Sequence, residues 1–326
     1  MVNVSAVLVN YNAGDELRRA LQSLSDELRE RRWEALVVDN ASTDGSQEIV
    51  GEFYYARLLQ NRENVGFARA MNQALAATTG SLVVILNPDC RLVAGAIATL
   101  KAELERHEGC AIVGPRILNP DGTVQGSARG DPDMLTGLFG RTALMRRLLP
   151  WMPSARRNVV SDMAIASGQP SVVVDWLSGA CMLAPRDALR QVGGFDERFF
   201  PVWFEDVDFC LRAAKAGYRN WYEPSAAAIH EGGHSVTRVT LPERQKYWYG
   251  SLLRFATKHF GPYSAGCILA SSAIGLALRG IASSFSARRR PERQAYFQAI
   301  RMILTGSIAN SPSPQSEKGK KQTFIA

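Results

Sequence analysis

The chain has 326 residues, of which 46% are hydrophobic, so it can bury one large α/β core with an appendage, or two domains. Its five cysteines are scattered, odd in number and in no metal-ligand spacing, which argues against a disulfide framework and fits a reducing cytosol. The first residues run directly into an apolar strand, so we expect no secretory leader.

The net charge of +7 is unevenly distributed. Residues 238–326 contain 14 Lys and Arg against 3 Asp and Glu, whereas residues 1–237 contain 24 against 28. This asymmetry predicts that the C-terminal part meets an anionic surface, either nucleic acid or lipid headgroups. We expect lipid rather than nucleic acid, because the basic residues lie outside the carboxylate-rich part of the chain.

Strands and helices are predicted to alternate through the first half of the chain. Apolar strands are expected at 4–9, 35–38, 56–60 and 82–86, and helices at 15–30, shortly after 46, and at 67–77. This alternation is typical of a parallel, doubly wound sheet. Each of these strands leads into a polar loop, and the carboxyl ends of parallel strands meet at one edge, where ligands bind in open α/β sheets.

The second half is predicted to continue the sheet less regularly. We expect a helix at 92–106, a strand at 111–118, a hairpin turn at 119–122 at a sheet edge, and a loop-like segment at 126–170. Further strands are expected at 172–176, 219–222 and 226–229, with helices at 185–192 and 205–216.

Asp89 follows the central strand directly, because Asn87 and Pro88 end the strand. A carboxylate at this edge can hold a divalent cation, and the cation can hold a diphosphate. The alternative is a turn aspartate that satisfies its own backbone. No G-x-G-x-x-G follows the first strand and no G-x-x-x-x-G-K-[ST] occurs, so neither a dinucleotide dehydrogenase nor a P-loop phosphotransferase is supported.

Residues 193–210 combine many aromatic side chains with three carboxylates, Glu205, Asp206 and Asp208, at the start of a predicted helix. Acids in a first helical turn often only complement the helix dipole, which explains Asp208 adequately. The aromatic residues look more like a pocket wall, where a carboxylate can serve as a general base. His230 and His234 lie in a glycine-rich loop and are candidate metal or phosphate contacts.

Taken together, these residues resemble a family 2 glycosyltransferase of the GT-A fold, in the branch that includes bacterial rhamnosyltransferases. Eight short motifs carry the resemblance in order between residues 4 and about 235. They are Val9 to Asn12, Val38 to Ser46, Asn64 to Ala68 with Asn72, Leu86 to Asp89, Trp176 to Ala180, Gly194 to Glu197, Phe204 to Asp208, and His230.

The resemblance implies a nucleotide site in the first part of the chain. Tyr11 would pack on the base, and Asp39 would accept a hydrogen bond from the imide N–H, which selects uracil or thymine. Asn64 and Arg69 would line the same site. The donor would therefore be a UDP- or dTDP-sugar.

The resemblance also implies a metal site and a catalytic base. Asp89 would ligate Mg²⁺ or Mn²⁺ with His230 as second ligand or phosphate contact, and Asp206 would be the base. Many relatives have an Asp-x-Asp motif here, whereas Asn87 occupies the first position in this chain, so we expect weaker binding of the ion. The donor sugar and acceptor would lie in a pocket formed by Trp176, Ser178, Gly179, Trp203 and Glu205.

The C-terminal part is predicted to be helical at 241–260, followed by an apolar stretch at 265–278. Fourteen residues are fewer than the ~20 that a membrane span needs, so we expect an interfacial helix with nearby arginines facing anionic headgroups. The alternative is an ordinary buried helix followed by a solvated basic one. Residues 311–326 are predicted to be a disordered tail.

The sequence therefore predicts an α/β protein with a doubly wound, mostly parallel sheet and a C-terminal helical extension. We expect a glycosyltransferase domain at 1–237, with a nucleotide half at 1–118 and an acceptor half at 119–237, and a basic extension at 238–310. The expected activity is inverting transfer, with dTDP-rhamnose as donor by analogy and a lipid-linked or polysaccharide acceptor, in the cytoplasm or peripherally on the inner membrane. The alternatives are another UDP-sugar donor (galactose, glucose or N-acetylhexosamine) or a non-catalytic binding relative.

Overall fold

The apolar runs at the start of the chain form the parallel half of a ten-stranded sheet. The computed structural model describes residues 3–29, 32–133, 168, 171–232, 240–284, 290–305 and 323–325. Strands β3 (Ala56–Gln60), β2 (Trp33–Asp39), β1 (Val4–Asn10) and β4 (Leu82–Leu86) are parallel neighbours in that order. All seven residues of β1 are buried, as expected for a strand covered on both faces.

The other half of the sheet is mixed. Strand β10 (Cys181–Pro185) runs antiparallel between β4 and β6 (Cys110–Leu118), and β11 (Arg219–His230) is parallel to β6. Short strands β5 (Cys90–Leu92) and β8 (Val172–Val174) pair antiparallel with β11, and β7 (Ala128–Arg129) pairs with β9 (Trp176–Leu177) outside this sheet. The predicted α/β class with a mostly parallel sheet is confirmed.

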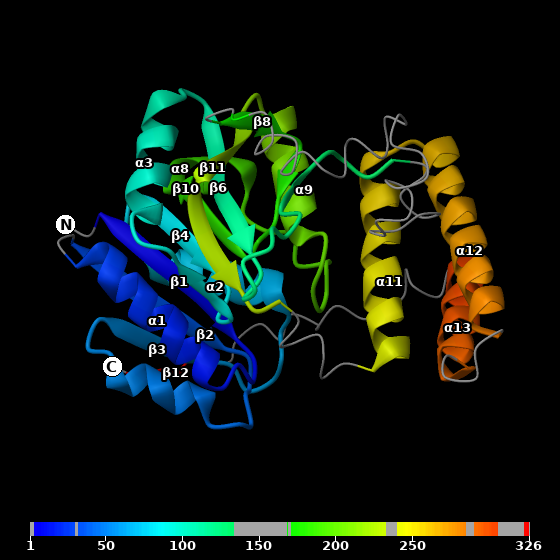
Figure 1. Cartoon of the computed structure of the whole chain (residues 1–326), viewed down its shortest axis with the longest axis horizontal. Coiled ribbons are helices and arrows are strands. Elements are labelled where there is room, and N and C mark those ends of the chain that lie inside the picture. Colours follow the sequence, from blue (N-terminus) through cyan, green and yellow to red (C-terminus); the bar gives the residue numbers. More distant parts are fainter. Residues whose placement is uncertain are drawn as a thin grey trace.

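Helices cover both faces of the sheet (Figure 1). One buried cluster joins α1 (Asp15–Leu28), the 3₁₀ helix η1 (Ser46–Glu52) and α3 (Ala96–Arg106) to the sheet. The second cluster joins α2 (Phe67–Ala77), α8 (Arg186–Val192) and α9 (Glu205–Lys215) to the opposite face. In α1 the buried leucines Leu17, Leu21, Leu24 and Leu28 recur every three or four residues, which gives the helix one apolar face.

Some predicted boundaries differ from the structure. The helix expected at 92–106 begins only at Ala96, because β5 pairs with β11 first and the carboxylate of Glu27 accepts hydrogen bonds from the backbone N–H groups of Gly95 and Ile97. The two strands expected at 219–229 form one strand, β11, with irregular register between Glu223 and Ala227. The turn at 119–122 forms, but it extends from β6, which is an interior strand.

Three helices follow the sheet: α11 (Leu241–His259), α12 (Pro262–Ser284) and α13 (Arg290–Thr305). They stand together at one end of the molecule (Figure 1). Buried residues of all three belong to the same cluster as α9, so the extension shares a core with the sheet. In α11, Thr240 and Glu243 form a capping box at the N-terminus.

Helix α12 is longer than the predicted apolar stretch, because it continues through 23 residues. In the part of the chain that the structure describes, it alone is long and apolar enough to cross a membrane, and 33% of its most apolar window is buried in the protein. It packs on α11 and α13, and Arg279 within it donates a hydrogen bond to Tyr249 of α11.

Several predictions concern residues outside those described. These are most of the segment 126–170, His234, the boundary between 237 and 238, and most of the predicted tail. Within that tail, Thr323–Ile325 form a short strand, β12, antiparallel to β3, where disorder was predicted.

Candidate active site

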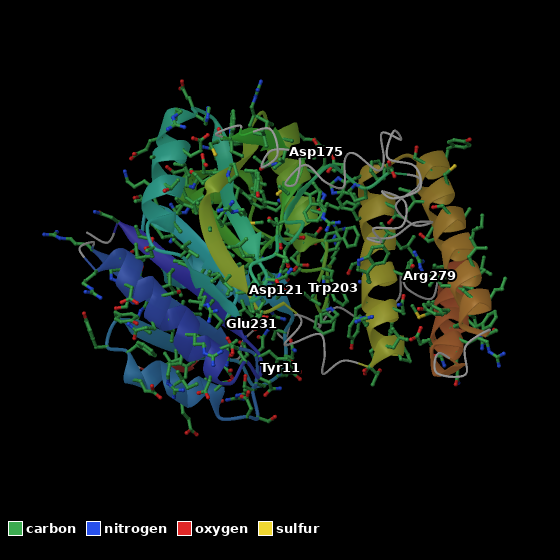
Figure 2. All side chains as sticks on the ribbon, in the orientation of Figure 1. Tyr11, Asp121, Asp175, Trp203, Glu231 and Arg279 are labelled. Carbon is green, nitrogen blue, oxygen red and sulfur yellow. The ribbon has the colours of Figure 1, made fainter. Side chains whose placement is uncertain are left out.

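Polar loops from β1, β2, β3 and β4 lie at the carboxyl edge of the sheet, as predicted, and β11 ends at the same edge. Figure 2 shows Tyr11, Glu231 and Trp203 at this end, on the side of the sheet that faces α11. The three residues follow β1, follow β11 and precede α9, respectively. Segments far apart in the sequence therefore contribute to one site.

Asp39 ends β2 and organises the loops beside it. Its carboxylate accepts hydrogen bonds from Asn10 Nδ2 (2.8 Å), Ser42 Oγ (2.5 Å) and the Ser42 backbone N–H (3.0 Å), and the residue is only 2% exposed. Tyr11, one residue beyond β1, is 40% exposed. Its ring is thus available to a planar ligand, whereas Asp39 is already engaged with the protein in this state.

Asn64 and Gly66 shape the loop before α2. Asn64 Oδ1 accepts a hydrogen bond from the Gly66 N–H (2.9 Å), and Gly66 has a φ of +83°. A Cβ at Gly66 would lie 2.7 Å from the ring of Phe200, so only glycine fits there. Arg69 is half-buried in the first turn of α2. The loop predicted to line the nucleotide site therefore also contacts the segment that leads to α9.

Asp89 and His230 lie together, although 140 residues separate them in the sequence. His230 Nε2 is 3.2 Å from Asp89 Oδ1, and the backbone N–H of Glu231 donates to the Asp89 carbonyl (3.0 Å). His230 Nδ1 is 3.0 Å from Gln125 Oε1, an acceptor, so Nδ1 carries a proton and Nε2 is the ring nitrogen that faces Asp89. Gln125 also donates to the His230 carbonyl (2.7 Å).

This pair fits a divalent cation. A carboxylate oxygen and an imidazole nitrogen with a fixed tautomer are both metal-ligand types, and the side chains are 9% and 15% exposed. Among the described residues there is no group of three or more His, Cys, Asp or Glu that could hold a metal ion. Two protein ligands leave most coordination positions to water and to phosphate oxygens, a common arrangement for Mg²⁺.

Glu205 and Asp206 begin α9 in contrasting surroundings. Glu205 is 5% exposed, and burial, followed by the nearby charges of Asp206 and Asp208, raises its pKa well above the usual value. Asp206 is half-buried, and its carboxylate accepts hydrogen bonds from the N–H groups of Gly179 (3.0 Å) and Val207 (2.8 Å). A helix N-terminus with such donors suits an anion, so Asp206 is the member of this pair that can hold a negative charge and accept a proton.

The predicted pocket wall is only partly present. Trp176 is 6% exposed and its Nε1 donates to the Gly130 carbonyl (2.8 Å), so its ring belongs to the core. Four aromatic residues that were expected to face a ligand are also buried, with exposed fractions of 7% or less: Phe195, Phe199, Phe204 and Phe209. That part of the prediction was wrong, because core aromatics and pocket aromatics have the same sequence pattern. Trp203 is half-exposed.

The Asp89–His230 pair and Asp206 lie on either side of residues 178–180. The Asn87 N–H donates to the Ala180 carbonyl (2.9 Å), which places the loop of Asp89 beside residues 178–180. On the other side, Gly179 contacts the Asp206 carboxylate, and the Ser178 N–H donates to Ser127 (2.8 Å). A cation-binding pair and a proton acceptor thus flank the same short segment at the edge of an α/β sheet. This arrangement is that of a group-transfer enzyme acting on a phosphorylated substrate.

Comparisons with known proteins identify the family to which the chain belongs. Residues 5–156 match the family described as "Glycosyl transferase family 2", and residues 153–309 match "Glycosyl transferase family group 2". The chain is 34% identical over 274 residues to the N-acetylglucosaminyl-diphospho-decaprenol L-rhamnosyltransferase of Mycobacterium tuberculosis, covering 79% of this chain and 86% of that protein. The chain belongs to the family 2 glycosyltransferases.

Further similarities agree with this assignment. A 62-residue segment is 44% identical to the rhamnosyltransferase WbbL of Escherichia coli, covering 19% of this chain and 23% of that protein. Among solved structures, the chain resembles a mannosyltransferase from Pyrobaculum calidifontis in complex with GDP-Man and Mn²⁺. The TM-score is 0.57 at 18% identity, over 93% of this chain and 87% of the other. The predictions of family, GT-A fold and hexosyltransferase class are confirmed.

Proposed function

We propose that this enzyme transfers L-rhamnose from dTDP-L-rhamnose to a hydroxyl group of a lipid-linked glycan, with inversion at the anomeric carbon. The observation that carries the proposal is the position of Asp206 across residues 178–180 from the Asp89–His230 pair. The similarity to a mycobacterial enzyme named for L-rhamnose transfer to a diphospho-decaprenol acceptor supports the choice of sugar and acceptor class.

In this proposal the donor binds at the ends of β1, β2 and β4. The exposed ring of Tyr11 packs on the thymine base, and Asp39 accepts a hydrogen bond from the imide N–H. Asp39 accepts three hydrogen bonds from Asn10 and Ser42, and a carboxylate has about four acceptor sites, so Oδ2 can accept the imide hydrogen bond as well. Asn64 and Arg69 line the other side of the nucleotide.

Asp89 and His230 would hold Mg²⁺ or Mn²⁺ beside the diphosphate. When bound, the cation supplies positive charge where negative charge develops on the leaving dTDP. The residues themselves contribute orientation: Gln125 fixes the His230 tautomer, and the Glu231–Asp89 backbone contact keeps the two ligands adjacent.

Asp206 acts as the general base. The acceptor hydroxyl lies against residues 178–180, Trp203 forms the adjacent wall, and Asp206 takes the hydroxyl proton as the oxygen attacks the anomeric carbon. The new C–O bond forms opposite the breaking bond to the β-phosphate oxygen, and dTDP leaves with the bonding electron pair. Burial raises the pKa of Glu205, immediately before Asp206, and so disfavours a second negative charge beside the base.

Calorimetric binding of UDP, dTDP, GDP, ADP and CDP, with and without Mg²⁺, tests the donor assignment. We expect dTDP to bind most tightly and its binding to strengthen with the metal. Stronger binding of UDP than of dTDP would contradict the rhamnose assignment in favour of a UDP-sugar, and no binding of any nucleotide would overturn the proposed activity.

The lipid-linked acceptor implies contact with a membrane, and the outer faces of α12 and α13 suit an anionic one. Helix α12 exposes large apolar side chains along one face of the helix, namely Tyr263 (82%), Ile274 (55%), Leu278 (57%) and Ile281 (54%). Helix α13 exposes Phe297 (54%) and Leu304 (74%) together with Arg293 and Arg301. Apolar residues interleaved with arginines favour a surface of anionic lipid, peripheral on the cytoplasmic side.

We expect Leu278→Glu and Arg293→Glu each to reduce sedimentation with vesicles that contain phosphatidylglycerol. Tyr54→Glu is the matched control, because Tyr54 is fully exposed on the opposite part of the molecule. Deleting α12 would be a poorer test, because its Ile268 and Leu276 belong to the core. The proposed lipid surface would be contradicted if both variants sedimented like the original enzyme, or if that enzyme bound neutral vesicles as well as anionic ones. If the enzyme self-associates and the two variants do not, these faces bind a second copy of the chain.

A further inference from the structure

Helix α11 lies behind the segment that presents the proposed base. Ser251 Oγ donates to the Val202 carbonyl (3.2 Å), and Arg254 donates to the Phe200 carbonyl (3.4 Å). The rings of Trp248 and Phe255, on the same helix, each pack 5.7 Å from the ring of Phe204. Consecutive turns of α11 therefore contact alternate residues, Phe200, Val202 and Phe204, of the segment just before Asp206.

The contacted segment is strained where it turns into α9. Trp203 and Phe204 have φ angles of +78° and +71°, in the left-handed region that bulky residues rarely adopt. Bulky residues in this region are strained and persist only where the surroundings fix them. Because Phe204 is the N-terminal cap of α9, relaxation here would move Glu205 and Asp206.

A buried charge cluster fastens the end of α11 to α9. Asp208 is fully buried, and its carboxylate accepts hydrogen bonds from Arg212 Nε (2.7 Å) and Lys258 Nζ (2.5 Å). His259 Nε2 lies 2.7 Å from Asp208 Oδ1, and Lys258 also donates to Asp196 (2.7 Å). Lys258 thus links two carboxylates that lie on either side of the strained segment.

The protonation states agree with this arrangement. Burial lowers the pKa of His259 despite the neighbouring Asp208, so the ring is neutral, with Nε2–H directed at Asp208 and Nδ1 facing Lys215. Burial opposes charge on Asp196, but hydrogen bonds from Arg198 and Lys258 outweigh it and lower the pKa of this carboxyl. Lys258 therefore bridges the carboxyl groups of Asp196 and Asp208.

We propose that Lys258 and His259 are positioning residues for catalysis: through Asp208 and Asp196 they hold α9 and the 196–208 segment so that Asp206 faces Gly179. The C-terminal extension is then part of the catalytic apparatus as well as a surface for the membrane. This inference rests on the proposed role of Asp206 as base.

The test is Lys258→Met in the full-length enzyme, with rates expressed per nucleotide-binding site to count only folded protein. Each carboxylate keeps one cation in this variant, Arg198 for Asp196 and Arg212 for Asp208, so we expect it to fold. Because small displacements of catalytic groups can cost about 100-fold, we expect kcat to fall between about 10- and 100-fold with an unchanged KM for the donor. Lys258→Arg should recover most of this loss.

Lys246→Met is the matched control, because Lys246 is exposed on the same helix, remote from the cluster. A normal kcat for Lys258→Met, or a loss that Lys246→Met shares, would overturn the inference, as would a proportional change in kcat and donor KM. Asp206→Asn is measured in parallel. If Asp206→Asn remains active, the assignment of Asp206 as base fails. If Asp206→Asn is inactive and Lys258→Met is normal, only the role of α11 is rejected. If Lys258→Met does not fold, His259→Asn gives the same comparison, with the same outcomes deciding it.

Discussion

Asp206→Asn is expected to reduce glycosyl transfer by about 10²–10⁴-fold while leaving nucleotide affinity nearly unchanged. The amide cannot accept the proton of the acceptor hydroxyl, and Asp206 lies beside residues 178–180, away from Tyr11 and Asp39, which bind the nucleotide in our proposal. The measurement is the initial rate of sugar transfer together with calorimetric binding of dTDP.

Glu205→Gln is the matched control for this prediction. Burial raises the pKa of Glu205, which favours the uncharged form, and glutamine resembles a neutral carboxylic acid in shape. We expect this variant to retain most of its activity. Asparagine at 206 leaves one of the N–H groups of Gly179 and Val207 without its acceptor, so some loss of stability is also expected. An inactive Glu205→Gln beside an active Asp206→Asn would transfer the base role to Glu205.

The pairing of Asp89 with His230 was expected from the family resemblance alone. In the structure, β5 begins directly after Asp89 and pairs antiparallel with β11, so that His230 lies opposite Cys90. Gln125 was not predictable: it follows an ordinary turn, and only the fold brings it to His230. The same holds for Lys258, whose partners Asp196 and Asp208 lie about 50 or more residues away. Sequence patterns locate strand ends well, but they do not report which polar side chains support them.

The aromatic residues near α9 illustrate the opposite error. Phe199 and Phe209 were expected to wall a pocket and instead fill the core beneath α9. Aromatic side chains serve both purposes, and local sequence contains no information on which side of the backbone is solvent. The length of α12 was underestimated for a related reason: the helix continues past Arg279, where the hydroxyls of Ser283 and Ser284 bond to the Gly280 carbonyl.

Asp89→Asn is expected to remove the strengthening of dTDP binding by Mg²⁺ or Mn²⁺ and to lower transfer by about 10²–10³-fold. The substitution keeps the shape of the side chain but removes its charge, and the remaining ligand, His230, is neutral. Since Asn87 already fills the position where many relatives have a further acid, Asp89 is the only carboxylate of the 86–89 motif. Calorimetric titration of dTDP at several metal concentrations measures the first effect, and initial rates measure the second.

Gln125→Leu provides a graded comparison at the same site. It leaves both ligands in place but removes the acceptor that fixes the His230 tautomer, so we expect metal affinity to fall by about 10–100-fold, less than in Asp89→Asn. Nucleotide binding without metal should be alike in both variants and in the original enzyme, because neither residue faces the base. Metal-dependent binding that persists in Asp89→Asn would show that the cation is held elsewhere, and a chelator that leaves transfer unchanged would show that the reaction needs no bound cation.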